Sequence, residues 1–114
     1  MRTALRLLAL TSGAIFVGMA QAAAVFINEV HYDNTGTDTG EAIEIAGPAG
    51  TDLTGWSLVL YNGANGSVYN TTALSGVIAH QQNGFGTLSF SYPTNGIQNG
   101  SPDGIALVNG GSVV

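Results

Sequence analysis

The chain has 114 residues, a formal net charge of −5 and no cysteine, so disulfide bonds cannot supplement its core. Its only basic residues, Arg2 and Arg6, stand at the very start, and all acidic residues follow them. Beyond residue 22 there are seven acidic side chains and no lysine or arginine. Because binding of phosphates depends on basic side chains, we expect no direct binding of DNA or RNA by that part.

The first 22 residues have the pattern of a secretory signal peptide. Two arginines precede an apolar stretch at residues 7–19, and small residues at 20–22 form a cleavage site. The apolar stretch is shorter than the about 20 residues of a membrane span, and a retained anchor is the open alternative. We expect a protein secreted from a bacterial cell, with residues 1–22 as signal peptide and residues 23–114 as one domain.

After this segment, helix-forming residues are sparse, and Asn-Gly pairs recur between short runs of β-branched, aromatic and aliphatic residues. Asn-Gly is a strong hairpin signal because both residues tolerate the positive φ of a type I′ turn. The pattern predicts strands at residues 25–32, 42–46, 56–61, 74–79, 86–92 and 104–108.

The polarity of these runs indicates how they pack. Apolar and polar residues alternate at residues 43–45 and 88–92, which predicts strands with one face in the core. Residues 58–60 and 105–108 are apolar throughout, as expected of strands covered on both faces. An all-β chain with closely spaced turns is best explained by two packed sheets, so we predict a β-sandwich.

The last five residues, 110–114, read as a turn followed by the start of a new strand. A strand that stops so early would leave its partner's edge unpaired. We therefore expect the sandwich to be incomplete at the C-terminus and the chain to be the first part of a longer protein. A natural terminus with a frayed tail is the alternative.

Three segments in order carry a family resemblance. Residues 25–34 contain Ile-Asn-Glu, residues 41–45 read Glu-Ala-Ile-Glu-Ile, and residues 52–58 read Asp-Leu-Thr-Gly-Trp-Ser-Leu. This set resembles the lamin-tail family, whose members are immunoglobulin-like β-sandwiches. The resemblance covers about residues 24–114 without the family's last strands, and it departs from the family at residues 46–48, where an Asn often follows.

The resemblance implies a lamin-tail domain of the kind found at the N-terminus of secreted bacterial nucleases, before a catalytic domain of the endonuclease/exonuclease/phosphatase type. Local chemistry gives the same segments structural roles. Asp52 can accept a backbone N–H in a glycine-containing turn, and Trp56 then enters the core. Glu29 and Glu44 belong on a solvated face, or one of them is partly buried and hydrogen-bonded. Asn28 can tie an edge strand to an adjacent turn.

One loop gathers hard oxygen ligands, namely Asp33, Asn34, Asp38 and Glu41. Ca²⁺ prefers such ligands, and it would offset repulsion in so acidic a chain. The spacing is not that of an EF-hand, because Asp38 rather than glycine stands at the sixth position from Asp33. These four residues are the predicted metal site, and a solvated loop of Asx-turns is the alternative.

Other chemistry has weaker support. His31 and His80 are far apart and no cysteine accompanies them, so a zinc site would need carboxylates brought to them by the fold. An exposed pair of His31 with Glu29 is the simpler interpretation. The sequence has no nucleophile motif and no phosphate-binding glycine loop with lysine. We therefore expect no catalytic site in this chain and no cofactor besides the possible Ca²⁺.

Three functions remain. The first is a non-catalytic secreted module that positions or stabilises a downstream catalytic domain, as the resemblance implies. The second is a stand-alone module that binds a cell-surface protein through an edge strand, or a carbohydrate through Tyr61, Tyr69, Phe85 and Tyr92. The third is another secreted enzyme whose site lies downstream.

Overall fold

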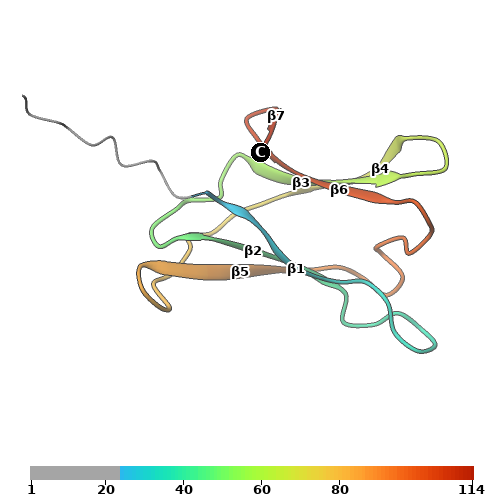
Figure 1. Ribbon diagram of the computed structural model, residues 1–114, viewed down its shortest axis with the longest axis horizontal. Helices are drawn as coiled ribbons and strands as arrows, with labels where there is room; N and C mark the ends of the chain where they lie inside the picture. Colours follow the sequence, from blue (N-terminus) through green and yellow to red (C-terminus); the bar gives the residue numbers. More distant parts are fainter. Residues whose placement is uncertain (1–23) are drawn as a thin grey trace, which may run out of the picture.

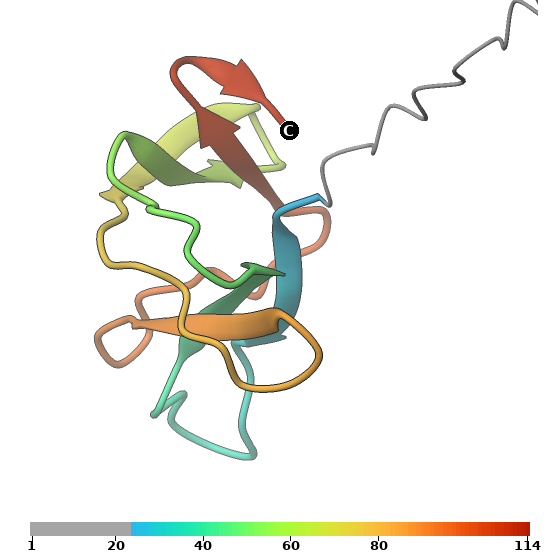
Figure 2. The same cartoon turned by 90° about the vertical axis from the view of Figure 1, so that its left-hand side faces the viewer.

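The computed structural model describes residues 24–114, and the predicted signal peptide lies outside them. The regular elements of this part are strands: β1 (Phe26–His31), β2 (Ala42–Pro48), β3 (Trp56–Asn62), β4 (Ser67–Ala73), β5 (Phe85–Ser91), β6 (Gly104–Asn109) and β7 (Ser112–Val113). They form two antiparallel sheets of order β1-β2-β5 and β4-β3-β6-β7. The sheets pack as two layers (Figures 1 and 2), which confirms the predicted β-sandwich. Residues 24–114 contain no helix that could cross a membrane.

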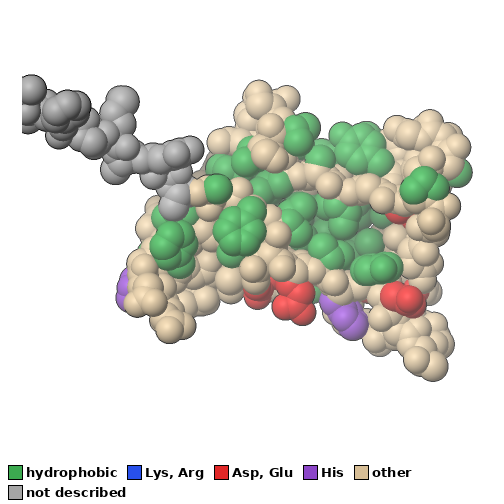
Figure 3. Space-filling model, in the orientation of Figure 1, with side chains coloured by type: hydrophobic (Ala, Val, Ile, Leu, Met, Phe, Trp, Pro, Cys, Tyr) green, Lys and Arg blue, Asp and Glu red, His purple; other side chains and the backbone are tan. Residues whose placement is uncertain are grey.

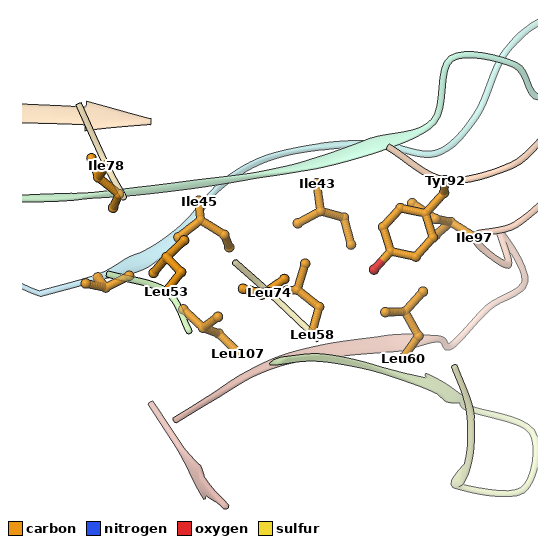
Figure 4. Close-up of a cluster of buried hydrophobic side chains, with 11 residues drawn as sticks. Ile43, Ile45, Leu53, Leu58, Leu60, Leu74, Ile78, Tyr92, Ile97 and Leu107 are labelled. Atoms are coloured by element: carbon orange, nitrogen blue, oxygen red, sulfur yellow. The ribbon is translucent and has the colours of Figure 1, made fainter. Parts of the chain in front are cut away.

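The core lies between the layers because alternate side chains of each strand point inward. Ile43 and Ile45 of β2 face Leu58 and Leu60 of β3, and all four are fully buried (Figure 4). Glu44, between the two isoleucines, lies on the outer face, as the alternation predicts. The core also contains Val25, Leu53, Leu74, Ile78, Tyr92, Ile97 and Leu107.

The strand predicted at residues 74–79 is wrong. The segment bonds instead to the loop between β2 and β3: Leu53 N–H donates to Gly76 O over 2.9 Å, and its one strand-like pairing is an isolated bridge. Leu74 and Ile78 are nevertheless buried. The segment is apolar because Leu74 and Ile78 fill the core, although its backbone does not form a strand.

β4 was missed because its sequence is polar. Asn70 favours turns when read alone, but Thr71 and Thr72 have high strand propensity, and β4 pairs with β3 along most of its length. It is the edge strand of the four-stranded sheet. An edge strand with a solvated face needs few apolar residues, so hydrophobic patterning gave no signal.

The outer face of the four-stranded sheet also differs from expectation. The apolar runs at residues 58–60 and 105–108 predict cover on both faces. Leu58 and Leu107 are buried, but Val59 and Val108 are only partly buried. No described element lies over that outer face (Figure 2).

Candidate functional site

The predicted calcium ligands lie in the loop between β1 and β2, at one end of the sandwich. Asp33 is exposed and Asn34 partly buried, whereas Asp38 is 8 % and Glu41 only 1 % exposed. Asp38 and Glu41 therefore point into the protein, while Asp33 points into solvent. The four residues share one loop but are not arranged around one open position.

Asp38 uses its carboxylate to close the loop. One oxygen, Oδ1, accepts the backbone N–H of Asn34 over 2.9 Å. The other, Oδ2, accepts the Asn99 side-chain amide over 3.0 Å, and the Asn34 amide donates to Thr39 O over 2.8 Å. The loop is thus fixed both to itself and to the segment that connects β5 with β6.

Glu41 makes the second connection to that segment. Its Oε2 accepts Gly96 N–H over 2.6 Å and its Oε1 accepts Ile97 N–H over 3.3 Å. The backbone repeats the link, because Tyr92 N–H donates to Glu41 O over 2.8 Å. Both carboxylate oxygens of this buried side chain therefore serve as acceptors for backbone donors, a common way to compensate the burial of a charge.

A cation at this loop would compete with those N–H donors for the same oxygens. Within residues 24–114, no group of three or more His, Cys, Asp or Glu side chains is placed to hold a metal ion. Amide and backbone oxygens can also bind Ca²⁺, so the calcium site stays a prediction.

Asp103, which sequence reasoning did not single out, lies at the same end of the molecule. Its Oδ1 accepts Gly63 N–H over 2.9 Å, which ties the β3–β4 turn to the start of β6. Its Oδ2 is buried and has no hydrogen-bond partner among the described residues. Asp103 and Asp38 both line a recess of about 430 Å³, together with the amides of Asn62, Asn95 and Asn99.

The two histidines do not form a common site. His31 ends β1, whereas His80 precedes β5 at the opposite end of the same sheet. His80 Nε2 accepts Gly84 N–H over 2.9 Å and so supports a turn. His31 lies on the outer sheet face with Glu29 and Glu44 around a small recess of about 100 Å³.

Of the two acids on this face, Glu44 is partly buried and hydrogen-bonded, as the second of the two sequence interpretations proposed. Glu29 is exposed and stands opposite Glu44 in the β1–β2 register. The Asn28 side chain donates to Glu44 Oε1 over 2.7 Å, so it ties the edge strand to strand β2 and not to a turn, as the sequence had suggested. Figure 3 shows acidic side chains and a histidine along this outer edge.

The turn before β3 follows its sequence prediction. Asp52 Oδ1 accepts Thr54 N–H over 2.9 Å, and Gly55 has a φ of 86°. The Thr54 backbone bond, with a further side-chain bond from Thr54, lowers the pKa of Asp52. Trp56 then packs partly buried against the core, so this segment has a structural role.

Of the four aromatic residues considered for sugar stacking, only one has a freely exposed ring. Tyr61 and Tyr69 are partly buried, and the Tyr69 hydroxyl accepts Gln98 N–H over 2.9 Å. Tyr92 is buried in the core (Figure 4). Phe85 is 46 % exposed at the start of β5.

Tyr92 also carries the one raised pKa among the described groups with a resolved shift. Its hydroxyl lies 2.9 Å from Thr72 Oγ1 on β4. Burial raises the pKa of Tyr92; the Thr72 hydrogen bond lowers it in part, and Tyr69 adds to the rise. The side chain thus links the β5–β6 connection to the opposite sheet.

Comparison of the chain with protein-family models, curated proteins and solved structures finds no match.

Proposed function

We propose that this chain is a non-catalytic, secreted β-sandwich module of the lamin-tail, immunoglobulin-like type, and that it positions or stabilises the catalytic domain of an extracellular nuclease. The observation that carries the non-catalytic role is the use of its buried carboxylates. Each of the four oxygens of Asp38 and Glu41 accepts a hydrogen bond that fixes the loops at this end, whereas Asp103 Oδ2 has no partner among the described residues, which is why the test below includes a variant of Asp103. Hydrolases that use acids need carboxylate oxygens free for a metal or a water.

The link to a nuclease rests on the sequence resemblance alone. Charge supports an accessory role over a DNA-gripping one, because residues 24–114 contain seven acids and neither lysine nor arginine. Such a surface repels phosphates at low ionic strength. The catalytic domain, not this module, would then bind the nucleic acid.

The test is an activity and binding assay of the purified chain. Supercoiled plasmid is incubated with Mg²⁺ or Ca²⁺, and a commercial nuclease in the same buffer is the positive control. We expect no nicking and no mobility shift at either low or high salt. Cleavage that disappears in Asp103→Asn, or a salt-sensitive shift, would contradict the proposal.

A second candidate is a stand-alone module that binds a protein or carbohydrate on a cell surface. One observation favours a protein partner: β7 pairs only with Val108 and Asn109 of β6. Over residues 104–106, β6 therefore has a partner strand on its β3 side alone among the described residues. Exposed strand edges can accept an extended segment of another chain.

The space beside this edge is lined by apolar side chains of both sheets and by polar residues of the β5–β6 connection. A groove of about 640 Å³ runs between the sheets there, and Ile27, Val30 and Ile105 contribute to its lining. Figure 3 shows hydrophobic side chains reaching the surface between the two layers. A strand added to β6 could place alternate side chains over this groove.

A further inference from the structure

The groove described above lies between the two sheets. The outer face of the three-stranded sheet carries a second groove, and we infer that this one binds a neutral oligosaccharide. We call it the two-phenylalanine groove: Phe26 and Phe85 on either side of Ala46, with the amides of Asn28, Gln82 and Asn83. The groove has a volume of about 580 Å³. The inference names a site for the second candidate function, in which the domain binds a carbohydrate. It rests on that function alone and does not depend on any link to a nuclease.

The strand register places the two rings on one face. Phe26 stands opposite Ala46 on β2, and Phe85 stands opposite Pro48 on the other side of the same strand. Positions 46 and 48 share a face because strand side chains alternate. The small side chain of Ala46 leaves the space between the two rings unfilled.

Both rings are unusually open to solvent. Phe26 is 48 % and Phe85 46 % exposed, whereas the core is filled by residues that are almost completely buried. The sandwich therefore does not use these rings for its own packing to the extent that it could. Clustered exposed apolar side chains on a soluble domain commonly mark a binding surface.

The hairpin that carries Gln82 and Asn83 is fixed by hydrogen bonds of Gln81 and of the backbone. Gln81 accepts Thr87 N–H over 3.1 Å and donates to Thr87 O over 3.4 Å. The backbone closes the same hairpin, since Phe85 N–H donates to Gln82 O over 2.9 Å. This hairpin presents Gln82 and Asn83 beside the Phe85 ring, and neither amide makes a side-chain hydrogen bond within the described residues.

The chemistry of the lining selects the ligand class. No acidic or basic side chain lines the groove, so nothing there would pair with a charged ligand. Aromatic faces carry a negative potential that suits the C–H faces of sugar rings. The amides of Gln82 and Asn83 can both donate to and accept from hydroxyl groups, whereas the Asn28 amide already donates to Glu44. A neutral sugar chain offers both features, and a few polar groups on an apolar surface are the usual design of such sites.

Isothermal titration of the purified chain with cellohexaose, laminarihexaose and chitohexaose tests the inference. We expect at least one of these neutral probes to bind, with an affinity that NaCl does not change. Phe26→Ala and Phe85→Ala should each weaken binding about tenfold or more. Tyr32→Ala is the matched control, because Tyr32 is 44 % exposed but lies outside the groove; it should bind as the parent chain does.

All three variants change exposed side chains, and equal thermal midpoints would show that they remain folded. Failure of all three probes to bind at millimolar concentration would overturn the inference. So would binding that survives in the Phe26→Ala, Phe85→Ala double variant, or that Tyr32→Ala weakens equally. None of these outcomes bears on DNA cleavage, so the accessory role is judged separately.

Discussion

Glu41 and Tyr92 attach the connecting loops at one end of the sandwich to the rest of the domain. The Glu41 carboxylate accepts two backbone N–H groups from the β5–β6 connection. The Tyr92 hydroxyl meets Thr72 on the opposite sheet. The sequence analysis predicted Glu41 as a Ca²⁺ ligand and considered Tyr92 as a residue that stacks on a sugar. Their partners are distant in sequence, so no local pattern could reveal that both side chains are turned inward.

Tyr92 makes the stability of the fold depend on pH at the alkaline end. Burial raises its pKa in the folded state, whereas an unfolded tyrosine titrates near pH ~10. Below about pH 10 both states keep the proton and the stability is fully present. Above it, the unfolded state loses the proton first, so the free energy of unfolding falls as pH rises.

We predict that Tyr92→Phe flattens this alkaline fall. The variant also loses the Thr72 hydrogen bond, which should cost about 0.5–1.5 kcal/mol at neutral pH. Urea unfolding at neutral pH and at several alkaline values measures both effects. Tyr32→Phe changes an exposed tyrosine and should keep the parent's pH dependence. An equally steep alkaline decline in Tyr92→Phe would show that another group is responsible.

The Asn-Gly pairs located turns and loops but not their type, because only Asn83-Gly84 of the six pairs has two positive φ angles. Asn83 and Gly84 have φ values of 50° and 80°, and Gly110 and Gly111 have 56° and 88°. Two successive positive φ angles are those of a type I′ turn, which Asn-Gly and Gly-Gly favour. The hairpins closed by these turns follow from residues that are adjacent in the sequence.

The strands β2 and β5 were predictable because burial of one face makes apolar and polar residues alternate. The edge strand β4 is mostly polar and shows no such alternation, so it was not predicted. The segment at residues 74–79 failed for the opposite reason: it is apolar because it fills the core, but its backbone pairs with a loop. Which loops meet at one end of the sandwich depends on sheet order. Sheet order is a property of the whole fold, so the recess near Asp38 and Asp103 was not predictable.

The β3–β4 turn is an element whose position depends on one glycine. A Cβ added at Gly63 would overlap the carbonyl oxygen of Pro102, and Gly63 N–H donates to Asp103. We predict that Gly63→Ala destabilises the fold by about 1–3 kcal/mol or more, because overpacking against backbone cannot be relieved by a rotamer change.

Gly104→Ala is the matched control, since its added Cβ would approach only the Tyr61 side chain at 3.9 Å. It should change the urea midpoint much less than Gly63→Ala does. Equal midpoints for the two variants would show that the turn can move away from Pro102 at little cost. The packing of this turn would then not help to fix the recess beside it.

At the scale of the whole molecule, the two-layer architecture follows from the alternation of apolar and polar residues and from the turns. The composition of the exposed surfaces, in contrast, depends on how the strands are ordered in the folded domain. The outer face of one sheet presents partly buried valines, and the other presents two open phenylalanines. Charge is distributed just as unevenly, since residues 24–114 hold acids without lysine or arginine to pair with them (Figure 3). Mutual repulsion of these acids opposes the compact state.

We therefore predict that salt stabilises the folded chain. Raising NaCl from about 0.01 M to about 0.1 M shortens the screening length from roughly 30 to roughly 10 Å, so the thermal midpoint should rise.

CaCl₂ at matched ionic strength separates the screening of charges from the binding of Ca²⁺. A calcium site at residues 33–41 should add a further rise that saturates and is reduced in Asp33→Asn, which changes an exposed acid of that loop, but not in Glu29→Gln. Equal midpoints in the two salts would contradict the calcium site and leave screening in place. A midpoint that does not respond to NaCl would instead show that the acids are too far apart, or too well solvated, for their repulsion to limit stability.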